Sequence, residues 1–346
     1  MRFDLTDVQS SWKSKGETLG RDLGVNATAA DAVMGAARVG LLDRRADLVS
    51  IAAAVEAMAH GSPSAAMALA MHTVVAGAAS SIERVGDLLF RGELGGALAL
   101  SSEDVPLARG NTVSGRAAWV APIVDGGLAV VGARNGDDLA AFAVPLTGRG
   151  VTVEPVEAAG LRPLVCAHLM LRDAEAVHVG PTVPVMARLR VLIAAVGLGI
   201  GRRALEEALV SARAAGGGAA GEQTVQGLLA DAATELDAAL MLTLKAAAED
   251  SSLTLSAASM AKLAATGAAQ HAIAWTTQVV GVDTFRAGHV SERLAQDVRA
   301  LELFAGRTEA LRAAVAEEVL PQQNAASRML KRDNSQLPTP NSQSAR

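Results

Sequence analysis

The sequence predicts a mainly α-helical protein with a central antiparallel β-barrel domain between two helical blocks. Half of its 346 residues are hydrophobic but only 2% are aromatic, so small side chains fill much of the core and let helices approach closely. Long stretches on both sides carry apolar residues at helical spacing. From about residue 97 to 183, valines, alternating patterns and Gly-containing turns replace that spacing, which is typical of a compact antiparallel sheet.

The first predicted domain, residues 1–96, is a helical block. Asp4 and Thr6 are candidate caps of its first helix. A second helix is expected from Ala29 to Val39, followed by a glycine. Two Ala-rich helices follow, and the Gly-Ser-Pro sequence at 61–63 separates them.

The second predicted domain, residues 97–184, contains the stretch around which the chain is organised. Val113 to Ala121 and Leu128 to Ala133 are rich in valine and predict two strands joined by a turn at 122–127. The first strand holds Trp119, one of three tryptophans in a chain without tyrosine.

The third predicted domain, residues 185–320, is a helical bundle with hydrophobic stripes at helical spacing. After Pro321 the composition turns polar, and a disordered tail is expected over 321–346. The expected helices of the bundle are Met186 to Ala215, Gln223 to Ala248, Ser256 to Val280, and one or two shorter ones between Ser291 and Glu318.

Charge and cysteine usage exclude several classes of function. A formal net charge of −5 argues against nucleic acid as a partner. The lone Cys166, expected to be a buried strand residue, cannot form an internal disulfide, which favours a reducing, cytoplasmic setting. The longest apolar run, Val191 to Ile200, is too short to span a bilayer, so no membrane association is expected. The six histidines show no pair at metal-ligand spacing, so no metal site is predicted, and His72 is expected in the core.

Several local patterns occur in collinear order over about residues 1–320. They are Phe3-x-Leu5-Thr6-x-x-Gln9, Leu100-Ser101-Ser102-Glu103, Ser114-Gly115-x-x-x-Trp119-Val120-Ala121, and Arg190, Gly199, Arg213, Gln223, Gln278 and Gly281 in the bundle. Together these patterns resemble the acyl-CoA dehydrogenase family. The resemblance implies FAD as cofactor and an acyl thioester as substrate, which loses a proton to a glutamate and a hydride to the flavin. It also implies assembly through the bundle, as a homo-oligomer or as a hetero-oligomer with a homologous chain.

The resemblance also implies a set of cofactor contacts, each with a plainer alternative. Trp119 would flank the flavin ring, or else cap the barrel core. Arg213 would reach the FAD of a neighbouring subunit, or else be a solvated cation at a helix end. The remaining implied contacts are hydroxyls from Ser101 or Ser102, the backbone of Ala121 where the family usually has threonine, and Gln223, Gln278 and Gly281 near the FAD of the other subunit.

The largest departure from the family concerns the catalytic base. The position of the glutamate is Ala305, and the alternative position used by some members is Leu189, so neither carries a titratable group. Glu302 and Glu309 are weak substitutes, expected on the solvated surface. Arg190 matches an arginine that lines the substrate mouth, with a helix-surface arginine as the alternative.

Three functional hypotheses follow from these observations. The first is a subunit of a flavin-dependent acyl-CoA dehydrogenase whose base is carried by a homologous partner chain. The second is a flavin-dependent monooxygenase of the same fold, which needs no α-proton base. The third is a binding or scaffold subunit without flavin.

Overall fold

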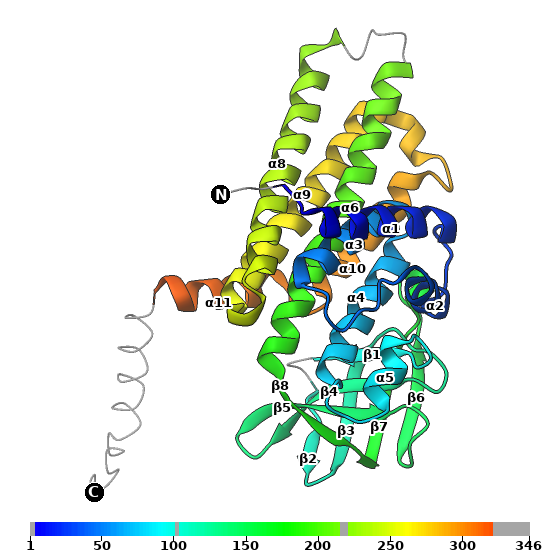
Figure 1. The fold of residues 1–346 in the computed structure, drawn as a ribbon. Helices are drawn as coiled ribbons and strands as arrows, with labels where there is room; N and C mark the ends of the chain where they lie inside the picture. The colour runs from blue at the N-terminus through cyan, green and yellow to red at the C-terminus, as the bar shows by residue number, and fades with distance from the viewer. Residues whose placement is uncertain (1–3, 101–103, 215–220, 321–346) are drawn as a thin grey trace, which may run out of the picture.

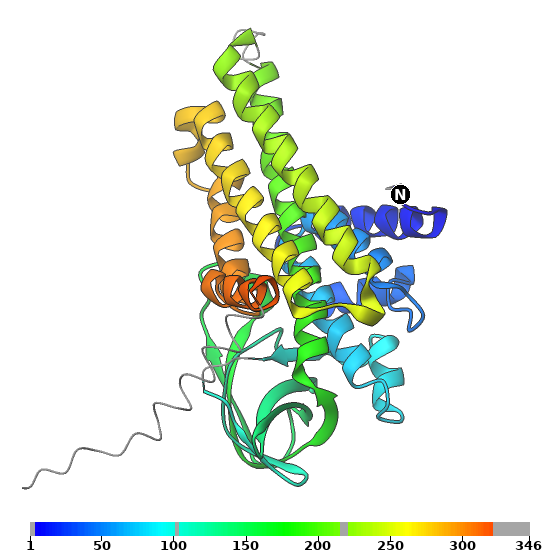
Figure 2. The ribbon, with the colours of Figure 1, turned by 90° about the vertical axis from the view of Figure 1, so that its left-hand side faces the viewer.

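The computed structural model describes residues 4–100, 104–214 and 221–320. The N-terminal helices lie across the middle of the molecule, the sheet lies at one end, and the long helices of the bundle extend to the other end (Figure 1). The view turned by 90° shows the same order along the long axis (Figure 2). The predicted tail, 321–346, lies outside the described residues.

The first three N-terminal helices begin at hydrogen-bonded caps. α1 (Asp7–Leu23) starts at Thr6, whose hydroxyl accepts from the Gln9 N–H in a capping box. α2 (Ala29–Val39) has the predicted bounds and ends at Gly40, whose φ of 73° is left-handed. The other helices of this block are α3 (Leu48–Gly61), α4 (Pro63–Ala78) and α5 (Val85–Phe90).

The β-domain is an open, mixed sheet, so the prediction of a closed antiparallel barrel is wrong. Its strand order is β6-β7-β3-β2-β4-β5-β8, with β1 beside β4, and the described end strands β6 and β8 do not pair with each other. Both end strands carry proline, Pro155 in β6 and Pro181 in β8, which cannot donate to a further strand. The strands are β1 (Gly96–Ala99), β2 (Leu107–Arg109), β3 (Thr112–Val120), β4 (Leu128–Asn135), β5 (Asp138–Pro145), β6 (Val151–Val156), β7 (Cys166–Glu175) and β8 (Val177–Pro181), with the short helix η1 (Arg162–Leu164) before β7.

The two valine-rich strands of the prediction are present as β3 and β4, but β2 lies between them. β2 pairs antiparallel with β3 and parallel with β4, and β1 also runs parallel to β4. A parallel neighbour must come from a distant part of the chain or through a crossover, so neither local turns nor alternation reveals it. The parallel pairings are therefore a property of the tertiary fold.

The bundle is built on α6 (Thr182–Ala214), which starts directly after β8, four residues earlier than predicted. By length and composition α6 is apolar enough to cross a membrane, but 78% of its most apolar window is buried inside the protein. It packs against α3, α4, α8 and α9. The remaining elements are α8 (Gln223–Ala248), η2 (Asp250–Ser252), α9 (Leu255–Val280), η3 (Gly281–Phe285), α10 (Val290–Leu303) and α11 (Thr308–Val319).

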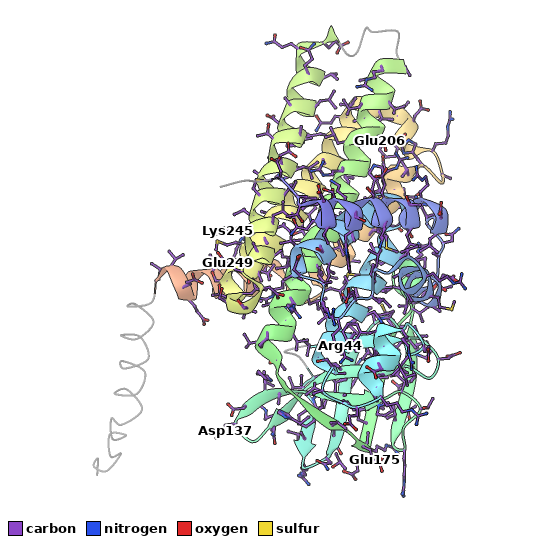
Figure 3. All side chains as sticks on the ribbon, in the orientation of Figure 1. Arg44, Asp137, Glu175, Glu206, Lys245 and Glu249 are labelled. Carbon is purple, nitrogen blue, oxygen red and sulfur yellow. The ribbon has the colours of Figure 1, made fainter. Side chains whose placement is uncertain are left out.

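The N-terminal block and the bundle share one continuous core. Buried side chains of α3, α4, α6 and α9 belong to a single cluster, and a second cluster lies within the sheet around Phe142 and Val131. Glycine allows the close approach of α6 to α3, because a Cβ at Gly199 would lie 2.3 Å from the carbonyl oxygen of Glu56. Charged side chains such as Lys245, Glu175 and Asp137 lie on the outside (Figure 3).

Candidate functional site

Trp119 lies near the end of β3, where the strand departs from regular pairing. The register between β3 and β7 shifts between Ala117 and Val120, and Trp119 has a left-handed φ of 55°. Left-handed backbone costs a residue with a side chain roughly 1–2 kcal/mol. The side chain is 49% exposed, so Trp119 does not cap the core. It presents a large aromatic surface that a planar ring can cover.

His168, on the neighbouring strand β7, holds Trp119 in two ways. The Trp119 peptide N–H donates to His168 Nδ1 at 3.2 Å. The two rings meet edge to face, with their centroids 5.8 Å apart at an interplanar angle of 86°. Burial and the nearby Arg116 guanidinium lower the pKa of His168, while Glu154 and Asp104 oppose that shift. No motif or spacing in the sequence points to this histidine.

The other predicted contacts near Trp119 offer less. Ala121 is fully buried, and both its peptide N–H and its carbonyl are already paired with Leu98, at 3.3 and 2.8 Å. The Ala121 peptide N–H is therefore not free to donate to a flavin, contrary to what the resemblance implied. Ser101 and Ser102 lie outside the described residues.

The position of the family base lies in the short connection between α10 and α11. Ala305 has a left-handed φ of 56°, and Gly306 follows with a φ of 105°. Arg190 holds this turn from α6: its Nε donates to the Ala305 carbonyl at 2.9 Å, and its Nη1 to Ser259 Oγ at 2.7 Å. Arg190 is only 6% exposed, so it is not a helix-surface arginine, and burial lowers its pKa to about 10. Leu189 is also buried.

Lys262, on α9, is a second buried cation under the same turn. Its ammonium donates to the carbonyl of Gly306 at 2.7 Å, to that of Phe304, and at 3.4 Å to that of Glu302. Burial, and then the charge of Arg190, lower the pKa of Lys262 to about 7, while Glu302 opposes the shift. Cations near the carbonyl end of α10 interact favourably with its dipole.

Together, Arg190 and Lys262 bind the carbonyls of residues 302, 304, 305 and 306. The turn that carries the base in the family is thus firmly held here, although Ala305 supplies no carboxylate. Lys262 was missed because lysine in an Ala-rich helix suggests a solvated face. Its spacing from the buried Ala258 and Ala265 would have placed it on the core side of α9.

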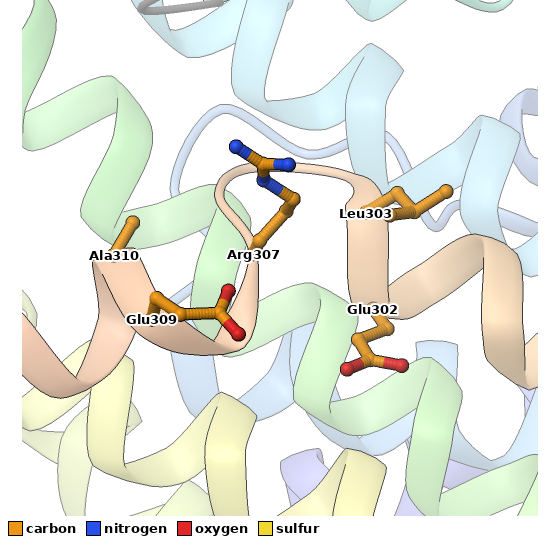
Figure 4. A pocket seen from close by; sticks show the side chains of 5 residues that line it. All are labelled: Glu302, Leu303, Arg307, Glu309 and Ala310. Carbon is orange, nitrogen blue, oxygen red and sulfur yellow. The ribbon is translucent and has the colours of Figure 1, made fainter.

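The two candidate substitute carboxylates differ from each other. Glu302 is half-buried, and its carboxylate accepts from Thr308 Oγ1 at 2.9 Å and Gln270 Nε2 at 3.1 Å, which corrects the expectation of a solvated side chain. Glu309 is exposed, as expected. Both line an open hollow of about 640 Å³, on either side of the connection that holds Ala305 (Figure 4). Its other lining residues are Leu303, Arg307 and Ala310.

The predicted FAD contacts of the bundle lie far from Trp119. Arg213 is in the last turn of α6 and Gln223 is the first residue of α8, at the end of the bundle opposite the sheet (Figures 1 and 2). At 1.5 Å per residue, Arg213 lies roughly 34 Å along α6 from Arg190. Gln278 is exposed near the end of α9, and Gly281 ends that helix with a φ of 73°. One copy of the chain therefore does not bring the two halves of the predicted cofactor site together.

The segment after α9 has an exposed apolar surface and an internal ion pair. Val282 and Phe285 in η3 are 83% and 84% exposed. Arg286 lies close enough to Asp283 to balance its charge, since Arg286 Nη2 is 3.3 Å from Asp283 Oδ1. The negative charge is thus balanced locally where a phosphate group is expected.

Two other residues are part of the core, as predicted. His72 is fully buried, accepts from the Gly96 N–H and contacts the Leu89 carbonyl, and burial lowers its pKa to about 4. Cys166 is buried in β7, which raises the pKa of its thiol to about 11. Within residues 4–100, 104–214 and 221–320, no group of three or more His, Cys, Asp or Glu side chains is placed to hold a metal ion.

Comparison with known proteins gives a sequence match for the C-terminal part of the chain. Residues 183–320 match the family model for the acyl-CoA dehydrogenase C-terminal domain. No curated protein matches the chain in sequence.

Among solved structures, butyryl-CoA dehydrogenase from Megasphaera elsdenii superposes with a TM-score of 0.82 at 18% identity, covering 92% of this chain and 100% of that one. A steroid ACAD named Tcur3481-Tcur3483 has a TM-score of 0.79 at 20% identity, covering 92% and 98%. PigA, solved with FAD and proline, has a TM-score of 0.80 at 15% identity, covering 92% and 99%. At these identities the likeness concerns the fold.

The fold thus extends over the helical block, the sheet and the bundle, while the sequence match covers the bundle. Residues 183–320 therefore match the acyl-CoA dehydrogenase C-terminal domain, and the described chain has the fold of solved acyl-CoA dehydrogenases.

Proposed function

We propose that this protein is a subunit of a flavin-dependent, acyl-CoA dehydrogenase-like oxidoreductase that acts on a thioester, and that a partner chain supplies the proton-abstracting carboxylate. One observation carries this proposal: the turn at Ala305 is bound by two buried cations, Arg190 and Lys262, yet it lacks the carboxylate. Burying two cations is costly unless their hydrogen bonds define a structure that is used.

The arrangement of the cofactor contacts supports a partner chain. Trp119 lies at the sheet, whereas Arg213, Gln223, Gln278 and Gly281 lie at the far end of the bundle. Two chains packed through their bundles would bring one Trp119 toward the other chain's bundle end. The half-exposed indole and the neutralised Asp283 both suit FAD. When bound, FAD would accept the hydride that leaves the substrate.

This chain's own residues would then orient rather than deprotonate. Trp119 would support one face of the cofactor ring. Arg190 and Lys262 would keep the Ala305 turn in place as one wall of the substrate site. Among the structural neighbours, a steroid ACAD named as a pair, Tcur3481-Tcur3483, favours a bulky thioester and a two-chain assembly.

A flavin-dependent monooxygenase of the same fold is the alternative, because such chemistry needs no base at Ala305. A binding or scaffold subunit without flavin is the remaining alternative.

The visible spectrum of the purified chain separates these functions. Flavin absorbance only in a complex with a homologous partner chain supports the proposal. Flavin bound by the chain alone, with oxygen consumption upon reduction, supports the monooxygenase, and no flavin in either preparation supports the scaffold.

Installing the base is a second test. Ala305 already has a Cβ in left-handed backbone, so Ala305→Glu adds a carboxylate without a new backbone strain. We expect this variant, loaded with FAD, to gain dehydrogenation of a CoA thioester. Ala310→Glu, which adds a carboxylate to the hollow beside this turn, is the control and should gain none. No gain in either variant would indicate that more than the base is missing.

A further inference from the structure

We propose that His168 is a positioning residue that fixes the Trp119 indole, by accepting the Trp119 peptide N–H on its Nδ1, in the orientation that receives a planar cofactor ring. The part that concerns the ring rests on the proposed function. The part that concerns Trp119 does not, because it follows from contacts within this chain.

Trp119 needs an external support because its backbone is unusual. A left-handed φ of 55° is unfavourable for tryptophan, and the shift in register between β3 and β7 removes regular ladder pairing at this point. The 3.2 Å hydrogen bond to His168 takes the place of a ladder bond for the Trp119 N–H. The edge-to-face contact then limits rotation of the indole, which is otherwise half-exposed.

This support requires a neutral imidazole. Nδ1 accepts a hydrogen bond only when it carries no proton, so the neutral ring must hold its proton on Nε2. Protonation would place a second N–H against that of Trp119 and break the bond. The charged groups around His168 are Arg116 on β3, Glu154 on β6 and Asp104 before β2. Arg116 is paired with Asp104 at 2.5 Å, which leaves the Glu154 carboxylate as the third charge near the ring.

The sequence offers a clean way to observe Trp119. The chain has three tryptophans and no tyrosine, so replacing Trp12 and Trp275 by phenylalanine leaves Trp119 as the single emitting residue. In this background, emission, iodide quenching and near-ultraviolet circular dichroism report on Trp119 without any cofactor.

Two substitutions separate the acceptor from the ring. His168→Asn keeps an acceptor near the place of Nδ1 but removes the aromatic ring and its titration. His168→Phe keeps a ring for the edge-to-face contact but removes the acceptor. His178→Phe, whose imidazole instead contacts Phe142 edge to face, is the control for exchanging a histidine in the same sheet.

We expect His168→Phe to change the emission and quenching of Trp119 more than His168→Asn does, because asparagine keeps the acceptor, and His178→Phe to leave them near those of the parent. The parent should show a spectral transition at a pH below 6.5, the ordinary pKa of histidine, and His168→Asn should not. FAD binding, measured by flavin fluorescence in the active assembly, should weaken about tenfold in His168→Phe, the effect of one lost hydrogen bond at the upper end of its range.

The proposal is overturned if His168→Phe leaves the Trp119 spectra unchanged, or if the parent shows no transition on acidification. The second result decides the matter even if His168→Phe does not fold. If the parent binds no FAD, alone or with a partner chain, the proposed function fails, while the Trp119 spectra still decide the role of His168.

Discussion

Replacing the buried Lys262 by methionine is predicted to change the pH dependence of stability. Lys262 is fully buried beneath the Ala305 turn, and its amine lies among the carbonyls of Glu302, Phe304 and Gly306. Methionine fills a similar volume but neither titrates nor donates. The variant therefore separates the contribution of the amine from that of packing.

The magnitude follows from the two pKa values. In the unfolded chain Lys262 titrates at its ordinary value of 10.5, and in the folded chain at about 7. Between these values the unfolded state binds more protons, so the contribution of Lys262 to stability is complete only above 10.5 and declines as the pH falls through 7. The slope reaches at most about 1.4 kcal/mol per pH unit, which amounts to about 2 kcal/mol between pH 7 and 9. The carbonyl contacts favour the ammonium form and make this an upper value.

Guanidinium unfolding of the parent and of Lys262→Met at pH 7, 8 and 9 tests this prediction. We expect the free energy of unfolding of the parent to rise relative to the variant by up to about 2 kcal/mol across this range. Lys245→Met, which removes an exposed lysine from α8, should differ from the parent by less than about 0.5 kcal/mol at every pH. A difference between the parent and Lys262→Met that stays constant from pH 7 to 9 would refute the reasoning.

Three further predictions concern the core. Gly199→Ala places a Cβ against the Glu56 carbonyl and should lower the free energy of unfolding by about 1–3 kcal/mol. The control Gly227→Ala, whose Cβ would meet nothing within 4 Å, should leave the free energy of unfolding equal or raise it. Equal melting curves for the two variants would contradict the close approach of α6 and α3. His72 has a pKa of about 4 in the folded chain, so its contribution to stability is present above pH 6.5 and is lost as the pH falls toward 4. His72→Phe should be less stable than the parent at pH 7, and its stability should change less on acidification. Urea unfolding between pH 7 and 4.5 measures both effects. The Cys166 thiol, buried and with a pKa of about 11, should react with a disulfide reagent only after unfolding, and rapid reaction of the native chain at pH 8 would show that β7 opens readily.

Local patterns were sufficient to predict most helices. A capping threonine and a terminal glycine bound α2 at the predicted residues, and α8 also has its predicted bounds. These features depend on neighbours three or four positions apart, which the sequence displays directly. The absence of a carboxylate at Ala305 is equally a property of the sequence.

Long-range packing decided the rest. Two strands run parallel to β4 from elsewhere in the chain, which makes the expected antiparallel sheet mixed, and the described end strands β6 and β8 do not pair, which leaves it open. The sequence left Arg190 open between the substrate mouth and the helix surface and did not single out Lys262. Both side chains bind main-chain carbonyls more than forty positions away, which no local pattern reveals. The link between Trp119 and His168 spans 49 positions in the chain. The sequence alone therefore determined the helices, the aromatic residue and the missing base, whereas the tertiary structure decided which distant groups hold them in place, because hydrogen bonds across elements leave no periodic trace in the chain.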